Sequence, residues 1–346
     1  MCLAGRRFCL LPSGMKNKIK KILFAAFFLS VTDFSIFAFS KSDVEFSVSP
    51  HFGIMAGQLD EYIFSSSDDS VQKSLLEWEL KPLYCAGLKS KVGLKNFYLN
   101  ADLNFSLPLK CGILRDSDWN ADGSTKIIYS ELEEKNHFSF TGGLETGWNF
   151  YFENPFHKKG LKSSFLVTPA ASFYYSYFKI KSDDGYGYFG GEDYSANGEE
   201  VAWNSPYATY HKTYGINLTR EYFLIFTGIR LGMQITPEID FSAGVFFSPF
   251  AYIATYDSHL RKEGSYSLNG FQQGSFEYYK FDFLLSYRFS KKIYFFSEMD
   301  ILIGKLMKGD FYHNYYSEKP QLSSQKSGSK TFIFNVEAGI RFLLSF

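Results

Sequence analysis

The sequence predicts an all-β fold: a single ten-stranded antiparallel transmembrane β-barrel that extends above its membrane. Three observations support this prediction. Apolar and polar residues alternate with a period of two over long segments, which is the pattern of strands with one apolar face. Phe, Tyr and Trp make up 20% of the 346 residues, and they gather on the apolar faces and at strand ends, as in membrane girdles. The opposite faces carry charged residues along nearly whole strands, as a hydrated lumen would.

The first 40 residues are expected to be a leader that precedes the barrel. Residues 15–21 form a basic segment, an apolar stretch follows, and small residues at positions 38 and 40 precede a plausible cleavage site. We therefore expect a signal peptide that starts at Met15, and an exported barrel formed by residues 41–346. The alternative is an N-terminal membrane anchor, which the short apolar run and its Asp33 disfavour.

Ten strands account for the chain after the leader, and four of them show the alternation explicitly. Apolar residues occupy every second position in 97–107 and 281–289, every even position from 332 to 346, and most even positions from 138 to 150. The last of these segments ends on Phe346, which resembles the terminal signature of bacterial outer-membrane barrels. In chain order, the ten strands are expected at roughly 44–64, 72–90, 93–110, 127–150, 162–181, 206–231, 239–256, 272–290, 292–306 and 329–346.

The connections between these strands alternate in length. Those near 89–93, 154–162, 236–239 and 291–293 are short, whereas those near 65–71, 111–126, 182–205, 257–271 and 307–328 are mostly long and polar. Bacterial outer-membrane barrels have short periplasmic turns and long extracellular loops. We therefore expect both ends of the barrel in the periplasm and every connection after an odd-numbered strand on the cell exterior.

Composition and missing motifs exclude several classes of function. Six of the 36 basic residues and one of the 36 acidic residues lie in the leader, so residues 41–346 keep 30 basic against 35 acidic residues. This balance argues against a nucleic-acid partner, which needs a basic face. The sequence has no metal-binding or phosphate-binding motif, so no metal and no cofactor are expected. Cys85 and Cys111 fall at different heights of the predicted barrel, so no disulfide is expected.

Two of the predicted outer loops carry acidic motifs. Asp116 and Asp118 follow the third strand, and Asp257 and His259 follow the seventh. Strands four apart in a ring of ten stand nearly opposite, so the two motifs are expected to face each other across the barrel mouth. Each motif alone is most often a solvated turn or a weak cation site.

The four side chains together would suit hydrolysis. In a strand-like segment, Asp257 and His259 point to the same face. A carboxylate beside an imidazole fixes its tautomer and stabilises its charged form. Such a dyad, with two carboxylates opposite, could hold and deprotonate a water molecule.

These motifs resemble those of the omptin family of outer-membrane endopeptidases. Asp116-Ser117-Asp118-Trp119 is similar to the family's catalytic D-x-D-W segment, and Asp257-Ser258-His259 is similar to its D-x-H dyad. Leu76-Glu77-Trp78 resembles a further family segment, and the stretch around Glu61 resembles the one that carries an acidic residue at the base of the S1 pocket. The resemblance implies an aspartic-type endopeptidase of the outer membrane, with its active site facing outside.

The resemblance also implies how this enzyme would work. A water would sit between His259 and the Asp116–Asp118 pair, and no acyl-enzyme would form. Peptides or proteins would be the substrates, and the barrel would be a monomer in contact with outer-membrane lipid. Glu61 and Thr255 would contact the substrate. Thr255 is neutral where a second acid would serve a basic P1 residue, so we expect weaker selectivity for Arg or Lys at P1.

Members of the family need lipopolysaccharide, which Arg and Glu residues bind on the outer wall. The matching part of the fifth strand, residues 173–178, has aromatic residues instead, and Arg220 is a candidate remnant of that site. We therefore expect activity that does not depend on lipopolysaccharide.

Two alternatives remain at this point. The first is a catalytically inactive barrel that serves as an adhesin or a narrow pore, for which the Tyr- and Gly-rich loop 183–198 would offer a binding surface. The second is a soluble secreted β-sandwich, which shows the same alternation. A pore or an adhesin has no need for Asp116, Asp118, Asp257 and His259 on opposing loops.

Overall fold

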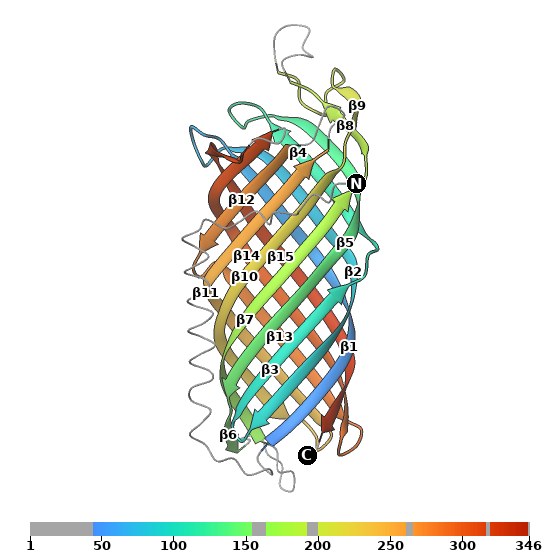
Figure 1. The fold of residues 1–346 in the computed structure, drawn as a ribbon, viewed down its shortest axis with the longest axis vertical. Coiled ribbons are helices and arrows are strands. Elements are labelled where there is room, and N and C mark those ends of the chain that lie inside the picture. Colours follow the sequence, from blue (N-terminus) through green and yellow to red (C-terminus); the bar gives the residue numbers. More distant parts are fainter. Residues whose placement is uncertain (1–43, 154–163, 192–199, 261–265, 316–318, 345–346) are drawn as a thin grey trace, which may run out of the picture. The chain divides into compact units, whose positions relative to one another are not determined.

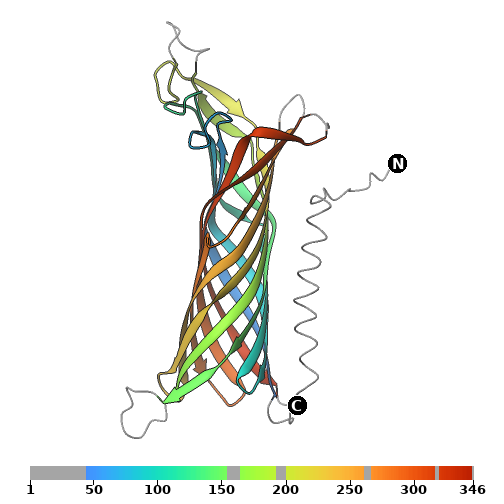
Figure 2. The same ribbon diagram turned by 90° about the vertical axis from the view of Figure 1, so that its left-hand side faces the viewer.

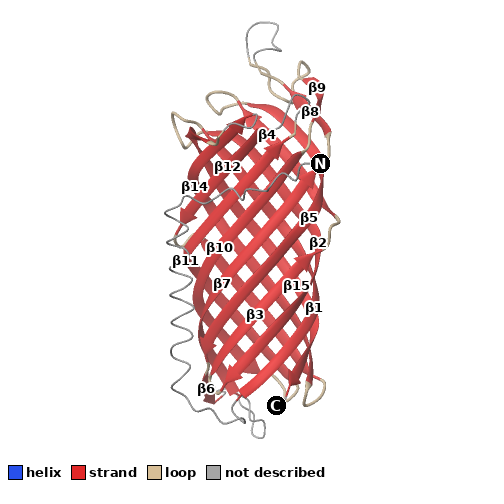
Figure 3. Ribbon diagram, viewed as in Figure 1, coloured by secondary structure: helices blue, strands red, loops and turns tan. Residues whose placement is uncertain are grey.

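The computed structural model describes residues 44–153, 164–191, 200–260, 266–315 and 319–344. In this part of the chain, all regular secondary structure is β-strand, and the strands join into one sheet (Figures 1 and 3). No described helix is long and apolar enough to cross a membrane. The predicted signal peptide lies outside the described residues. The strands are β1 (Val44–Phe64), β2 (Gln72–Leu94), β3 (Phe97–Ser106), β4 (Lys110–Trp119), β5 (Lys126–Trp148), β6 (Phe150–Glu153), β7 (Ser164–Ser182), β8 (Gly185–Phe189), β9 (Thr209–Thr213), β10 (Ile216–Gln234), β11 (Ile239–His259), β12 (Tyr266–Gly274), β13 (Tyr278–Arg288), β14 (Ile293–Tyr315) and β15 (Gln321–Leu344).

The sheet closes into a ring with ten positions, which confirms the predicted barrel. β1 pairs with β15 and closes the ring. β3 and β4 follow each other in one position, because each pairs with β2 on one side and β5 on the other. β12 and β13 likewise share the position between β11 and β14. β1 begins and β15 ends at the same end of the barrel (Figure 1), as predicted for two periplasmic ends.

The alternating faces of the strands have the predicted directions. In β15, the apolar side chains of Phe332 and Phe342 are exposed on the outer wall, whereas Thr331 and Glu337 are buried inside. Exposed apolar side chains recur around the ring and form the band that contacts lipid. Phe332 pairs with Gln58. Beyond this level charged side chains also face outward; Arg115 of β4, for example, pairs with Glu131 of β5. The band therefore ends below the outer part of the barrel.

Within the lipid band, the buried lumen holds a network of opposite charges. Arg230 binds Glu145 through both Nη atoms, at 2.5 and 3.1 Å, and binds Asp282 through Nε and Nη2, at 3.0 and 2.8 Å. Lys89 lies 2.6 Å from both Glu298 and Glu337. Charged groups at membrane depth are costly unless they are paired, so these ion pairs make the charged lumen possible.

Loss of Arg230 should destabilise the barrel strongly. We expect Arg230→Met to lower the free energy of unfolding by about 3–5 kcal/mol, because it leaves two buried carboxylates without their partner. Lys110→Met, which breaks the exposed Lys110–Glu133 pair, is the control and should leave the unfolding midpoint nearly unchanged. Urea unfolding in detergent micelles measures both values. Equal midpoints for the two variants would contradict this account.

The long outer loops that the sequence predicted are mostly strands, so that part of the prediction is wrong. Residues 111–119 belong to β4, and β11 continues through residues 257–259. Part of the predicted loop 182–205 is β8, which pairs with β5 and with β9 (yellow-green to yellow, Figure 2). Above the lipid band, a strand is not required to have an apolar face. The period-two pattern in the sequence therefore disappears, while the backbone hydrogen bonds between strands continue.

Candidate active site

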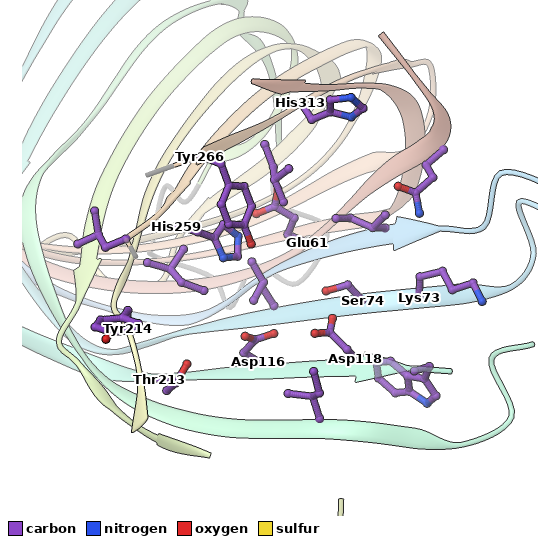
Figure 4. A pocket seen from close by; sticks show the side chains of 18 of the residues that line it. Glu61, Lys73, Ser74, Asp116, Asp118, Thr213, Tyr214, His259, Tyr266 and His313 are labelled. Carbon is purple, nitrogen blue, oxygen red and sulfur yellow. The ribbon is translucent and has the colours of Figure 1, made fainter. Parts of the chain in front are cut away.

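The two acidic motifs lie on strands at opposite positions of the ring. β4 occupies the third position and β11 the seventh, as the strand count predicted. Because side chains alternate along a strand, Asp116 and Asp118 project from β4 to one side, and Asp257 and His259 project together from β11. Asp116, Asp118 and His259 line one cavity of about 680 Å³ in the outer part of the barrel, where Figure 4 shows them converging. The structure thus brings the predicted residues together, on strands instead of loops.

The imidazole of His259 is held from two sides. Its Nε2 lies 2.9 Å from Oδ2 of Asp257, whose side chain is 1% exposed. The amide of Leu268 on β12 donates a 3.1 Å hydrogen bond to Oδ1 of Asp257 and fixes that carboxylate. The ring of His259 stacks on Tyr266, with centroids 4.5 Å apart and planes 11° apart. One ring nitrogen thus faces a fixed carboxylate, and the other is left for proton transfer.

Asp116 and Asp118 form a pair that resists double ionisation. Burial and the charge of Asp118 raise the pKa of Asp116 to about 8, although the nearby His259 lowers it. Burial also raises the pKa of Asp118, against a hydrogen bond from Ser74 and the charge of His259. Ser74 is opposite Asp118 on the neighbouring β2. Both shifts favour retention of a proton by the pair, and the pKa of about 8 for Asp116 extends this to neutral pH.

The carboxylates stabilise the charged form of His259. Burial lowers the pKa of His259, but the charge and the hydrogen bond of Asp257 outweigh it, with smaller contributions from Asp116 and Asp118. The net result is a pKa above the ordinary value of 6.5. The imidazole is therefore a stronger base than a free histidine, at the cost of being protonated up to a higher pH.

Glu61 and Thr255, the predicted substrate-binding residues, are placed differently. Glu61 of β1 lines the cavity near His259 (Figure 4) and is 4% exposed. Thr255 lies behind the cavity lining, with 1% exposure, and its hydroxyl accepts a 3.1 Å hydrogen bond from Nε of Arg220. Burial and the charge of Asp257 raise the pKa of Glu61 well above its ordinary value, against the effect of Arg220.

Arg220 is not on the outer wall, so its interpretation as a remnant of a lipopolysaccharide site is wrong. It is completely buried inside the barrel, with Nη2 3.9 Å from Oε2 of Glu61. The sequence held a signal for this placement. Arg220 stands at a two-residue spacing from Leu218 and Tyr222, both of which are completely buried, so it belongs to the inward face of β10. Its contact with Glu61 joins the sixth and first ring positions and could not be inferred from local sequence.

Three other residues complete the site and were not predicted. Ser74 lies opposite Asp118 and lowers its pKa, Tyr266 stacks on His259, and the amide of Leu268 donates to Asp257. They come from β2 and β12, whose pairing with β4 and β11 sets these contacts. Cys85 and Cys111 are both buried free thiols.

Comparisons with known proteins agree with this geometry. A model of the Omptin family matches residues 42–344. Among solved structures, the outer membrane protease OmpT from Escherichia coli matches with a TM-score of 0.71 at 12% identity, over 87% of this chain and 97% of that chain, and shows the same barrel fold. The translocator domain of the autotransporter NalP from Neisseria meningitidis gives a TM-score of only 0.30 at 8% identity, over 94% of this chain and 97% of that chain. A search of curated proteins found no match.

Proposed function

The chain belongs to the Omptin family, and on this premise we propose that it is an endopeptidase that hydrolyses peptide bonds at the extracellular mouth of its barrel. The protein is located in the outer membrane, as predicted. The observation that supports the activity most strongly is the cavity in which Asp116 and Asp118 of β4 face His259 of β11. The solved structure with the same fold is named as an outer membrane protease. The cavity is built by one chain, so we propose that the monomer is the active unit.

The proposed reaction uses a water molecule as the nucleophile. The water sits between His259 and the Asp116–Asp118 pair. His259 takes a proton from it as it attacks the scissile carbonyl, and later gives the proton to the leaving amine. Asp257 orients the imidazole and stabilises its cation. Because no Ser or Cys attacks the substrate, no acyl-enzyme forms.

The shared proton of the Asp116–Asp118 pair has a use in this scheme. The ionised oxygens accept a hydrogen bond from the water, and the protonated carboxyl can donate one to the carbonyl oxygen as negative charge develops there. The pKa of about 8 for Asp116 keeps this proton in place at neutral pH. The pair is thus proposed to position the water and to stabilise the tetrahedral intermediate.

Replacing the paired aspartates tests these roles. We expect Asp118→Asn and Asp116→Asn each to lower kcat by about 10²-fold or more, because each removes a group that orders the attacking water. Asp122→Asn, in the exposed turn after β4, is the control and should keep full activity. Steady-state cleavage of one fluorogenic peptide measures all three variants. Full activity in both pair variants would contradict their proposed role.

The interior below the cavity argues against a pore. Four large aromatic side chains there are completely buried: Trp78, Phe178, Tyr222 and Tyr278. The hydroxyls of Tyr222 and Tyr278 both bond to Thr331, at 2.9 and 3.1 Å. These large side chains fill the barrel beneath the active-site cavity, so an open aqueous path at this level has no room.

An adhesive surface is the second candidate function. The β8–β9 hairpin extends beyond the barrel rim (Figure 2) and exposes Tyr186, Tyr188 and Tyr210, with Tyr186 stacked on Tyr210 at 5.2 Å. Exposed aromatic groups of this kind often contact other proteins. Part of the predicted loop 183–198 lies outside the described residues.

Cleavage of a diverse peptide mixture by the purified, refolded protein tests the proposed activity. Mass spectrometry identifies the products, and the peptides that remain intact in a parallel reaction with His259→Ala define the cuts that depend on the site. Such cuts would support the endopeptidase. No His259-dependent cut under any condition would overturn it and favour the adhesive function.

The same assay tests the expected independence from lipopolysaccharide. Tyr175 and Tyr177 face the outer wall of β7 as the sequence suggested, but Lys179 and Lys181 follow them, and Lys181 pairs with Lys135 of β5. We expect equal rates with and without lipopolysaccharide. Activity that appears only with lipopolysaccharide would contradict this expectation. If changing the three lysines to Gln then abolished the activation by lipopolysaccharide, its binding site would be assigned to them.

A further inference from the structure

One wall of the active-site cavity includes Glu61, whose carboxylate forms a buried charge pair with Arg220 that the proposed reaction does not use. Glu61 lines the cavity from β1, and Arg220 of β10, on the opposite side of the ring, is completely buried and lies outside the cavity lining. Nη2 of Arg220 lies 3.9 Å from Oε2 of Glu61, and both side chains are shielded from solvent. A charge pair in this position must affect which substrate side chain can enter beside it.

Arg220 is held in place but not satisfied. Its Nε donates to Thr255, whereas Nη1 and Nη2 have no hydrogen-bond partner, and neither has Oε2 of Glu61. A guanidinium keeps its charge in a protein. If Glu61 is ionised, the pair is neutral; if Glu61 is protonated, as burial and Asp257 favour, the pair is positive. In neither state does it carry a net negative charge.

The rest of the cavity offers little to a cationic side chain. Asp116, Asp118 and Asp257 are the other carboxylates around His259, and the proposed reaction occupies all of them. The lining also contains two lysines, Lys73 and Lys212. Four further lining side chains are buried and apolar: Leu76, Ile216, Leu268 and Phe311.

We propose that the pocket beside Glu61 takes an uncharged, apolar P1 side chain, and that Arg220 determines this preference by cancelling the charge of Glu61. This inference rests on the proposed endopeptidase function. A lysine or arginine at P1 would meet a carboxylate whose charge is already compensated, and the positive charge of Arg220, 3.9 Å from that carboxylate, would oppose it. An apolar side chain instead gains contact with the apolar lining.

Profiling of the cleavage sites tests the preference directly. The refolded protein is given the diverse peptide mixture, and only cuts that are lost in His259→Ala are counted. The proposal expects most P1 residues to be apolar. His259-dependent cuts mainly after Lys or Arg, abolished by Glu61→Gln, would overturn the inference and leave the peptidase standing. No His259-dependent cuts at all would overturn the peptidase and the inference with it.

Variants of the pair separate its charge from its structural role. Arg220→Gln removes the positive charge beside Glu61, and a cationic P1 side chain would then itself keep Glu61 ionised. Cleavage after Lys and Arg should therefore rise about tenfold or more relative to cleavage after apolar residues. Arg220→Lys keeps the charge, and the double variant Glu61→Gln/Arg220→Gln removes both charges, so both should retain the apolar preference. Circular dichroism and thermal unfolding check that each variant folds.

Glu61→Gln, Arg220→Lys and the double variant still test the proposed role of Arg220 if Arg220→Gln does not fold. Glu61→Gln alone makes the pocket positive, so cleavage after Lys and Arg should fall further and cleavage after Asp and Glu should rise. A P1 profile that stays the same in Glu61→Gln, Arg220→Lys and the double variant supports a purely structural role and overturns the proposal.

Discussion

Replacing His259 with Ala is expected to lower kcat for peptide cleavage by about 10³–10⁴-fold, with little change in KM. The expected loss in kcat follows from the removal of the only proposed general base, since a positioned acid–base group accelerates a reaction by about 10²–10⁴-fold. Catalytic residues that act as a unit also lose most of their effect when one of them is removed. The ring sits between Asp257, 2.9 Å from its Nε2, and the cavity that Asp116 and Asp118 line. No neighbouring group in the described site can replace it.

The control for this variant is His137→Ala. His137 is exposed on β5, on the outer wall, and its loss should leave kcat within about twofold of the unchanged protein. Single-turnover kinetics with a fluorogenic peptide separates the chemical step from product release. If His259→Ala cleaved at the normal rate, the site would have no role in hydrolysis and the proposed function would fail.

The sequence was sufficient to predict the barrel because lipid imposes a simple rule on it. Each spanning strand must present apolar side chains outward and tolerate charges inward, as Phe332 and Glu337 of β15 do. This rule produces a period of two that is visible in single segments. The ring order then followed from counting strands, and it placed Asp116 opposite Asp257 without any knowledge of contacts.

The prediction was wrong where the lipid rule stops. Above the band, β4 and the end of β11 carry polar and apolar residues on both faces, so they looked like loops although their backbones are paired. The contact between Glu61 and Arg220 was also beyond the sequence, since it depends on how far two side chains reach across a closed ring. Counting strands predicts which strands lie opposite each other. Predicting side-chain contacts across the interior also requires knowledge of the shear and width of the barrel.

Asp257→Asn is expected to have two separable effects, a loss of about 10⁴-fold in kcat and a shift of the pH profile. Asn can present its amide N–H to Nε2 of His259, which favours the wrong tautomer for a base, and this change is known to cost about that factor in Ser-His-Asp enzymes. The measurement is kcat between pH 5 and 9 for both proteins, with the residual rate of the variant followed over long incubations.

The direction of the pH shift distinguishes an electrostatic role of Asp257 from a merely structural one. His259 must be neutral to accept a proton, so activity rises with pH as His259 loses its proton, and Asp257 contributes most to raising the pKa of His259 above 6.5. Removing the charge of Asp257 lowers that pKa, so the acidic limb of the profile should move to lower pH although the maximum rate falls. A variant that lost activity equally at every pH, with its acidic limb unmoved, would contradict the electrostatic role of Asp257. It would leave Asp257 with the role of orienting the imidazole of His259 alone.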